Sequence, residues 1–565
     1  MQSIMLRFKK YWDYQWVVVG FILIIGFLLR IWGINFGLPY IYHYDEHFYI
    51  ATAVKLGSGI VNNSPYAPTG LSNVLFFEYI GYFILGKLVG LFPTVQHFEL
   101  AYRTNPSMFY LLGRFTSAAF GTASIIAVYT IGLFLTKKMT GIMASILLAV
   151  SFIHVRDSHY SVPDIAMSTL VIFAVCFAIL YVQTGRQRFI YIASLVGGVA
   201  IAMKWIALPV ALTIWLAWIT VPDPKFIKKT SGNKASSHVI KGSVLVALLI
   251  SLGFSPGAFQ VIINPTPYIK EMIGQASSGQ YGGFEIWQVD TLPGWLFYGK
   301  TLIFGLGIIT VLLAIVGVIF YVYHSIRNKS NTMLILISFP LTYFILMGST
   351  PHYFSRYSLP LVPFVALFCA DTISVIHQQL LKWKTPFSNY IILIIFFLAI
   401  IPSLASSVKH DLILTRTDTR TIAKDWIEEN IPSESKIAVD WSVHGPPLSS
   451  HESSVLNSQR VYDVYYVGGT GLSDHTIEWY KQNGYDYLIA SSFIYQIPLV
   501  FKDLDLRRKE FYSSLDKELQ LVKNIYPNDE EREPDFIFDE IYGPMVSLWG
   551  RDRPGPVLKI YKIPG

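Results

Sequence analysis

The sequence predicts an all-α, multi-pass membrane domain followed by a small α/β domain on the outer side of the membrane. Hydrophobic residues make up 53% of the 565 residues and charged residues only 14%, whereas charged residues are about 25% of a typical soluble protein. Apolar runs of the length that crosses a bilayer core, about 20 residues, recur between residues 15 and 408. Residues 410–565 contain no such run and are rich in charge and tyrosine. The chain therefore divides into a membrane domain, residues 1–409, and an outer domain, residues 410–565.

Eleven apolar windows predict the membrane spans. The first window is too long for a cleaved signal peptide and has no small-residue cleavage site after it. Both cysteines, Cys176 and Cys369, lie inside apolar runs, so no disulfide framework is expected. We therefore expect about eleven transmembrane helices. The windows are residues 15–35, 107–135, 139–154, 165–183, 189–204, 205–221, 242–262, 299–324, 332–349, 358–377 and 390–408.

A further apolar stretch, residues 71–92, decides the orientation of the whole chain. If it does not cross the membrane, every lysine and arginine cluster falls on the cytoplasmic side, as the positive-inside rule requires. If it crosses, every cluster after the first falls outside. We therefore expect an amphipathic helix or helix pair at the outer surface, within an outer loop at residues 36–106. The N-terminus is then cytoplasmic, the C-terminal domain is extracytoplasmic, and the membrane is the plasma membrane. The clusters are Arg7/Lys9/Lys10, Lys137/Lys138, Arg186/Arg188, Lys225/Lys228/Lys229/Lys234/Lys241, Arg327/Lys329 and Lys382/Lys384.

The outer domain has a mixed helical and strand-like pattern. Residues 421–427 form a helical pattern that ends before Pro432, and a second helical stretch lies near residues 507–522. Strand-like runs lie at residues 436–439, 487–490 and 557–561. Helices and strands that alternate in this way predict a small α/β domain.

Few charged residues are expected at the outer ends of the membrane helices, and polar groups at that depth mark functional sites. Carboxylates there suit a general base that activates a hydroxyl or amine nucleophile. Fixed cations suit a phosphate leaving group, whose negative charge grows as the bond to it breaks. The candidate site residues are the carboxylates Asp45, Glu46, Asp157 and Asp164, the imidazole of His159, and the cations Arg114, Lys204 and Arg356.

Several segments carry a resemblance to one family. The pair Asp45–Glu46, just after the first span, resembles the acidic motif of GT-C fold glycosyltransferases, and more specifically of the protein O-mannosyltransferase and aminoarabinose transferase group, glycosyltransferase family 39. Residues 158–164 are similar to the second acidic motif of that group. Residues 197–204 look like its glycine-rich helix ending in lysine, and residues 356–363 resemble its Arg-Tyr…Pro…Pro element. The resemblance covers roughly residues 15–440 and depends on the order, spacing and common side of these motifs.

The resemblance implies a GT-C membrane fold and a donor sugar carried on a polyprenyl monophosphate of the undecaprenyl or dolichyl type. It implies inverting transfer to a protein, lipid or glycan acceptor on the outer face. Asp45 would be the catalytic base or its close partner, and Glu46 and Asp164 would also be catalytic, with Asp164 orienting the acceptor or the sugar. Lys204 and Arg356 would bind the donor phosphate. Asp157, His159 and Arg114 are expected to bind substrate. Some relatives carry a lysine near the donor phosphate where residues 70–78 of this chain have none.

Several of these residues also have a simpler structural interpretation, and for Arg114 this is a structural role. Asp45–Glu46 suits a solvated loop pair, Asp164 suits a helix N-cap, and Asp157 suits a surface ion pair with Arg156. Lys204 and Arg356 suit charged groups that reach from helix ends to the membrane surface.

A divalent metal is a further alternative for the first acidic motif. His43, Asp45 and His47 alternate along the chain, so an extended segment would direct all three to one side, and these residue types ligate metals. A monophosphate donor carries little charge, so we expect that no cofactor is required. The positive charge is placed in inside loops, and we expect no nucleic-acid partner.

Other functions compete with a polyprenyl-phosphate-dependent glycosyltransferase. A surface-polysaccharide ligase or polymerase is the nearest alternative. A lipid-linked sugar transporter or flippase would place charged groups near the midplane in related positions of two halves, and this sequence shows no two-half symmetry. A scaffold protein would not explain carboxylates and cations on one face.

Overall fold

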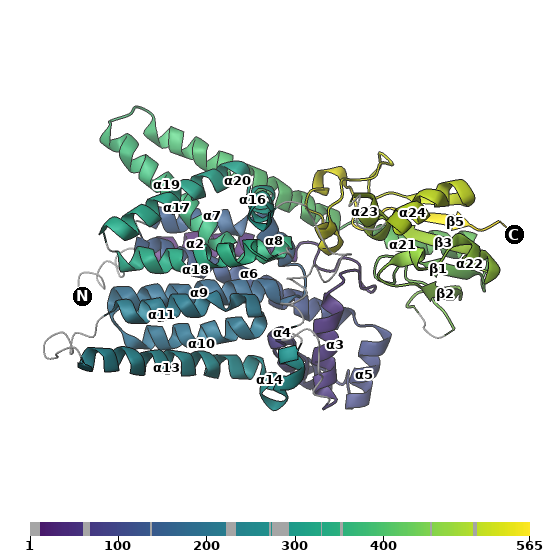
Figure 1. Cartoon of the computed structure of the whole chain (residues 1–565), viewed down its shortest axis with the longest axis horizontal. Coiled ribbons are helices and arrows are strands. Elements are labelled where there is room, and N and C mark those ends of the chain that lie inside the picture. The colour runs from purple at the N-terminus through teal and green to yellow at the C-terminus, as the bar shows by residue number, and fades with distance from the viewer. Residues whose placement is uncertain are drawn as a thin grey trace.

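The computed structural model of the chain shows a bundle of long helices with the C-terminal domain at one end (Figure 1). We call this end of the bundle the proximal end. The structure describes residues 12–59, 68–135, 138–221, 233–270, 273, 293–328, 330–350, 354–451, 455–500 and 506–564. Eight of the basic residues that predict the orientation of the chain lie outside this part: Arg7, Lys9, Lys10, Lys137, Lys225, Lys228, Lys229 and Lys329.

The predicted fold class is confirmed: a multi-pass helical membrane domain precedes a small domain with a sheet. Among the described residues, eight helices have the length and apolar composition of a membrane span, and four shorter apolar helices accompany them. Each of the eleven predicted windows overlaps a helix, while the number of spans stays a prediction. The helices are α2 (Trp12–Ile31), α6 (Ser107–Leu135), α7 (Lys138–Ala149), α9 (Pro163–Thr184), α10 (Gln187–Met203), α11 (Pro209–Thr220), α13 (Asn233–Gly257), α17 (Ile308–Asn328), α18 (Asn331–Gly348), α19 (Val362–Lys382) and α20 (Ser388–Leu414).

The window predicted at residues 299–324 is two helices rather than one. Gly307, with φ +87°, separates α16 (Gly294–Leu306) from α17, because a residue with positive φ interrupts the helix and glycine adopts positive φ without strain. Gly294 lies against the backbone of Gly348, and Gly305 lies against Ile153. Both partners belong to the proximal end, so α16 lies across that end of the bundle.

The stretch at residues 71–92 forms α4 (Gly70–Leu88), whose length and composition alone would suit a span. Its contacts are at the proximal end. The Asn73 amide donates to the Gly257 carbonyl oxygen (2.9 Å) at the end of α13, and the Tyr79 hydroxyl donates to the Phe109 carbonyl oxygen (3.0 Å) at the start of α6. Its later turns meet the same region, since the ring of Tyr82 packs on Phe92, Phe98 and Phe109. These contacts favour a surface helix over a span.

Two further helices cover the proximal end. They are α3 (Glu46–Gly57) and α5 (Val95–Thr104), and in Figure 1 both run across the direction of the long helices. Close packing of α10 against α13 positions the end of α10. A Cβ on Gly198 would lie 2.1 Å from the Ile250 carbonyl oxygen, and a Cβ on Gly253 would lie 2.1 Å from that of Leu195. Glycines therefore let the backbones of α10 and α13 touch, and this contact fixes the helix that ends just before Lys204.

The C-terminal domain contains one mixed five-stranded sheet with strand order β2-β1-β3-β5-β4. β1 is parallel to β2 and β3, and β5 is antiparallel to β3 and β4. The three strands expected from sequence are β1, β3 and β5, while β2 and β4 were not predicted. The elements are α21 (Thr419–Asn430), β1 (Lys436–Val439), β2 (Asp463–Tyr466), α22 (Ile477–Gln482), β3 (Tyr487–Ser491), α23 (Ser492–Val500), α24 (Leu506–Glu518), β4 (Gln520–Ile525) and β5 (Leu558–Lys562).

We expect a cysteine introduced at Pro93 to react with a membrane-impermeant maleimide added to intact cells, because the exposed turn after α4 adjoins the proximal end. A cysteine at the exposed Arg186, which joins α9 to α10 at the opposite end, is the matched control and should react only after permeabilisation. The native Cys176 and Cys369 are buried and contribute little background. Labelling of position 93 only from the cytoplasm would contradict the predicted orientation.

Candidate active site

An ion pair between Asp45 and Arg356 lies at the proximal end of the membrane domain. Asp45 directly precedes α3, and Arg356 lies in the 3₁₀ helix η3 (Ser355–Leu361), which leads into α19. Asp45 Oδ2 contacts Arg356 Nη1, and the two side chains are only 12% and 10% exposed. The fold thus brings together a carboxylate and a guanidinium that are distant in sequence, in a place of low dielectric constant where their interaction is strong.

A second carboxylate–cation pair adjoins the first. Lys204 Nζ donates to Asp164 Oδ1 at 2.7 Å and lies 4.5 Å from the ring centroid of Tyr357, the residue after Arg356. Lys204 directly follows α10, and Asp164 lies in the first turn of α9. Val162 occupies the N-cap position of α9, so the simpler interpretation of Asp164 as the N-cap is wrong. The Lys204 side chain stays 18% exposed, and Asp164 is buried.

Burial raises the pKa of the Tyr49 phenol, and the carboxylates of Asp45 and Asp164 raise it further. The two pairs meet at Tyr357, because Lys204 lies over the ring of this residue, which directly follows Arg356, the partner of Asp45. Four predicted site residues, Asp45, Asp164, Lys204 and Arg356, therefore share one site.

Glu46 and Arg114 form a separate, fully buried ion pair. Arg114 Nε and Nη2 donate to the two carboxylate oxygens of Glu46, each at 2.8 Å, and the backbone N–H of Ser161 donates to one of them at 2.8 Å. Arg114 Nη1 donates to the Ile34 and Phe36 carbonyl oxygens at 2.9 Å. Burial acts to raise the pKa of Glu46, but Arg114 outweighs it and the pKa is lowered. This geometry favours a structural role, and the catalytic role of Glu46 and the substrate-binding role of Arg114 stay predictions.

Asp157 lies in an ion-pair chain that reaches the C-terminal domain. Arg156 Nε donates to Asp157 Oδ2 at 2.9 Å, and Arg156 Nη1 lies 3.4 Å from Asp539 Oδ2. Burial raises the pKa of Asp157 to about 6 despite the Arg156 charge. The pair is buried, unlike the surface ion pair considered from the sequence.

Two residues of the C-terminal domain complete the site, and sequence reasoning missed both. Tyr542 places its ring centroid 4.2 Å from Arg356 Cζ, and Asp539 accepts the backbone N–H of Ser355 at 2.9 Å. Both belong to the 3₁₀ helix η5 (Phe538–Tyr542). The only sequence signal was a short run that mixes acidic and aromatic residues, at 535–542.

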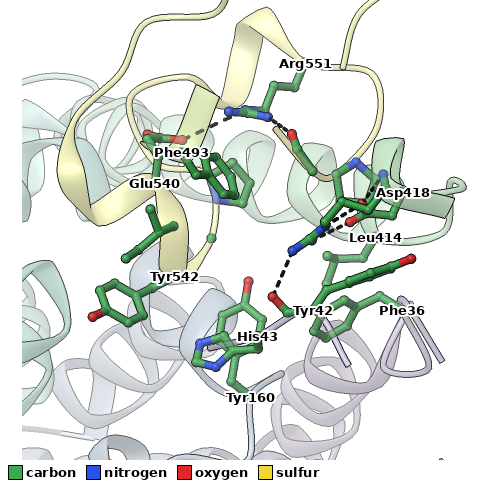
Figure 2. Close-up of a pocket in the computed structure, with 16 residues that line it drawn as sticks. Phe36, Tyr42, His43, Tyr160, Leu414, Asp418, Phe493, Glu540, Tyr542 and Arg551 are labelled. Carbon is green, nitrogen blue, oxygen red and sulfur yellow. Dashed lines mark hydrogen bonds and ion pairs between the residues drawn. The ribbon is translucent and has the colours of Figure 1, made fainter. Parts of the chain in front are cut away.

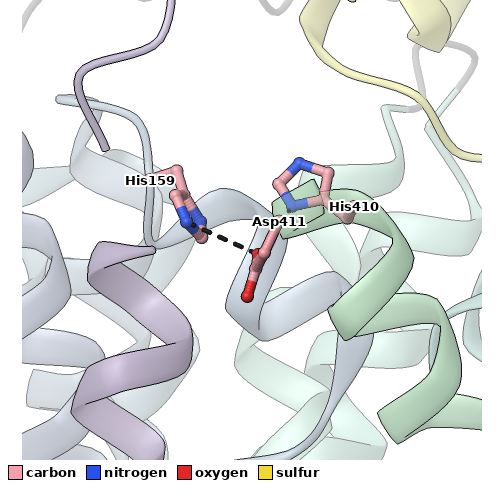
Figure 3. A group of neighbouring side chains, drawn as sticks. All are labelled: His159, His410 and Asp411. Carbon is pink, nitrogen blue, oxygen red and sulfur yellow. Dashed lines mark hydrogen bonds and ion pairs between the residues drawn. The ribbon is translucent and has the colours of Figure 1, made fainter. Parts of the chain in front are cut away.

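His159 forms a cluster with His410 and Asp411 (Figure 3). Its Nε2 lies 3.5 Å from Asp411 Oδ1 and 3.1 Å from the Trp32 carbonyl oxygen, and His410 Nδ1 lies 3.2 Å from Asp411 Oδ1. Burial lowers the pKa of His159 to about 4. The ligand atoms of these three side chains all lie within 4.8 Å of one another, a spacing that suits a metal ion. Within the part of the chain that the structure describes, this is the group of histidines and carboxylates with that spacing.

The three residues considered from the sequence as metal ligands, His43, Asp45 and His47, do not come together. Asp45 pairs with Arg356, and the ring of His43 stacks on Tyr160 with centroids 4.4 Å apart. Burial lowers the pKa of His43 to about 3, so its neutral Nδ1 accepts the Asp45 backbone N–H at 3.3 Å. His47 Nδ1 lies 3.5 Å from the Tyr110 hydroxyl. The three side chains therefore have different partners.

A pocket opens beside this site, between the two domains (Figure 2). The membrane domain contributes His43 and Tyr160, and the C-terminal domain contributes Tyr542. Two ion pairs border it: Arg420 with Asp418, at 2.7 Å, and Arg551 with Glu540, at 3.9 Å. Tyr542 lines the pocket and also contacts Arg356, so the pocket adjoins the site through this residue.

Comparisons with known proteins bear on the fold of the chain. Residues 111–252 match the family model described as dolichyl-phosphate-mannose-protein mannosyltransferase. The structure of the oligosaccharyltransferase of Archaeoglobus fulgidus superposes with a TM-score of 0.55 at 12% identity, covering 98% of this chain and 89% of that chain. The chain has the fold of the GT-C glycosyltransferases. The architecture that the acidic motifs implied is therefore confirmed.

Two further solved structures extend the comparison. Archaeal AglB from Archaeoglobus fulgidus, in complex with an inhibitory peptide and a dolichol-phosphate, has a TM-score of 0.53 at 12% identity and covers 96% of this chain and 78% of that chain. ArnT from Cupriavidus metallidurans in the apo state has a TM-score of 0.49 at 12% identity, with 96% and 97% covered. No curated protein matches the chain in sequence.

We expect Glu46→Gln to lower the stability of the protein by about 3 kcal/mol, because it leaves the Arg114 guanidinium buried without its counter-charge. Thermal unfolding in detergent measures this loss. The matched control is Glu99→Gln, which breaks the exposed pair of Glu99 with Arg103 and should change stability by less than about 1 kcal/mol. Equal melting temperatures for the two variants would contradict the structural role of the Glu46–Arg114 pair.

Proposed function

We propose that the chain is an integral-membrane glycosyltransferase that moves a sugar from a polyprenyl-monophosphate donor to an acceptor at the outer face. The observation that carries the proposal is the convergence of the pairs Asp45–Arg356 and Asp164–Lys204 at the proximal end. Carboxylates and cations in one site serve a reaction that removes a proton from one substrate and releases a phosphate from the other.

The carboxylate and the cations act on different parts of the reaction. The acceptor hydroxyl or amine attacks C1 of the donor sugar, and its proton passes to the Asp45 carboxylate as the new C1–acceptor bond forms. The bond between C1 and the phosphate oxygen breaks, and polyprenyl monophosphate leaves with one additional negative charge. Arg356 and Lys204 stabilise that charge. A single displacement of this kind inverts the configuration at C1.

Binding of the donor would also activate the base. Arg356 holds Asp45 through its guanidinium, and a donor phosphate that binds Arg356 competes with the carboxylate for the same donors. The carboxylate that is released is then free to accept a hydrogen bond from the attacking hydroxyl or amine. Asp164, which holds Lys204 at 2.7 Å, positions this second cation and is placed to orient the sugar or the acceptor.

The comparisons support a lipid-phosphate donor and an acceptor that is a separate molecule. The AglB structure of this fold contains a dolichol-phosphate and an inhibitory peptide. In the present chain, the pocket between the domains is lined by His43, Tyr160 and Tyr542, and Tyr542 also contacts Arg356, which favours an acceptor that approaches between the two domains. A transporter would need charged groups near the membrane midplane, whereas both pairs lie at one end of the bundle.

We expect Asp45→Asn to lower kcat at least 100-fold, since general-base catalysis contributes about 10²–10⁴-fold, while the melting temperature stays close to that of the wild type. Transfer from a radiolabelled polyprenyl-phosphate sugar by the purified, detergent-solubilised protein measures the rate. Asp463→Asn, at an exposed carboxylate of the C-terminal domain, is the matched control. Full activity of Asp45→Asn would overturn the catalytic role of Asp45.

We further propose that transfer needs no divalent metal, because Arg356 and Lys204 already supply positive charge beside the two carboxylates. Dialysis of the purified enzyme against EDTA should leave kcat within about twofold of its starting value. Magnesium or manganese added afterwards should have no effect. Activity that disappears with EDTA and returns with either ion would refute this part of the proposal.

A further inference from the structure

The environment of Arg356 includes a segment that the membrane domain does not supply. Its guanidinium carbon lies 4.2 Å from the ring centroid of Tyr542 and 5.1 Å from that of Phe354. An aromatic face attracts a guanidinium and fixes its plane. Tyr542 is buried, so its ring and the Asp45 carboxylate together confine the Arg356 side chain.

The backbone at Arg356 is held by the same segment. Asp539, one turn before Tyr542, accepts the backbone N–H of Ser355 at 2.9 Å through one carboxylate oxygen. Its other oxygen lies 3.4 Å from Arg156 Nη1. Asp539 is buried, and a hydrogen bond to a buried carboxylate is strong and directional. The helix η5 therefore contacts Arg356 from two sides, through its side chain and through the residue before it.

η5 is itself held rigidly. The Glu540 carboxylate accepts the backbone N–H groups of Met545 (3.0 Å) and Ser547 (3.2 Å). Gly543, with φ +138°, follows Tyr542, and a Cβ on it would lie 2.4 Å from the Tyr160 hydroxyl oxygen. Only glycine allows this approach of η5 to the second acidic segment.

We infer that Asp539 and Tyr542 are positioning residues through which the C-terminal domain orients Arg356 toward the donor phosphate. The inference rests on the proposed function, because it assigns a partner to a proposed phosphate ligand. It gives the C-terminal domain a part in donor binding as well as in lining the acceptor pocket. Loss of the Tyr542 ring leaves Arg356 free to adopt other rotamers. Binding of the donor must then order the guanidinium, and the entropy lost in doing so lowers the affinity for the donor.

The test is titration of full-length protein in nanodiscs with undecaprenyl monophosphate, which carries the phosphate without a sugar. Tyr542→Ala should raise Kd about tenfold, and Tyr542→Phe, which keeps the ring, should stay within about twofold of the wild type. Asp539→Ala should weaken binding, whereas Asp539→Asn, which keeps an oxygen for the Ser355 N–H, should weaken it less. Trp549→Ala, at an exposed side chain of the same domain, is the control and should bind as the wild type does.

A second measurement separates positioning from a general structural effect. In the double variant Arg356→Ala/Tyr542→Ala, Kd should equal that of Arg356→Ala alone, because the ring acts only through the guanidinium. If Tyr542→Ala does not reach the wild-type melting temperature, Tyr542→Leu replaces it, since leucine keeps apolar packing without a ring.

The outcomes distinguish this inference from the proposed function. If Arg356→Ala binds undecaprenyl monophosphate as tightly as the wild type, the proposed donor site is wrong. If Arg356→Ala weakens binding but Tyr542→Ala does not, or if the two effects are additive in the double variant, the positioning role is overturned and the donor site stands.

Discussion

The buried ion pair of Glu46 and Arg114 is the interaction on which the candidate site depends. It joins three segments, because Glu46 follows Asp45, Arg114 belongs to α6, and the Ser161 N–H donates to the same carboxylate. Leaving one partner of such a pair unpaired costs about 3–5 kcal/mol, so the pair is formed wherever the fold is formed. Asp45 is consequently held at the start of α3, and the loop that leads to Asp164 is held beside it.

The site combines groups of two kinds, and the difference follows from burial. Glu46 and Arg114 are fully buried and mutually satisfied, which suits a fixed support. The side chains of Asp45, Arg356 and Lys204 are 12%, 10% and 18% exposed, so they are nearly buried but within reach of solvent. Adjacent carboxylates in one motif thus have different environments, and their chemistry differs for that reason.

The C-terminal domain is part of the site rather than an appendage to it. Asp539 and Tyr542 contact the segment that carries Arg356, and Tyr542 also lines the pocket next to His43. The segment η5 therefore contributes both to the surroundings of Arg356 and to the lining of the pocket.

The sequence by itself determined the fold class and the end of the bundle at which the charges meet. Apolar runs and the placement of lysine and arginine depend on transfer of each segment from water to lipid, which is a local property of the sequence. The topology that follows from this pattern placed Asp45, Asp164, Lys204 and Arg356 on one face. Only the tertiary structure decided which charges pair, that α16 and α17 separate at Gly307, and that His159 turns toward Asp411. It alone brought Asp539 and Tyr542 to Arg356, because contacts between segments so distant in sequence arise from packing of the whole domain and leave no periodic signal along the chain.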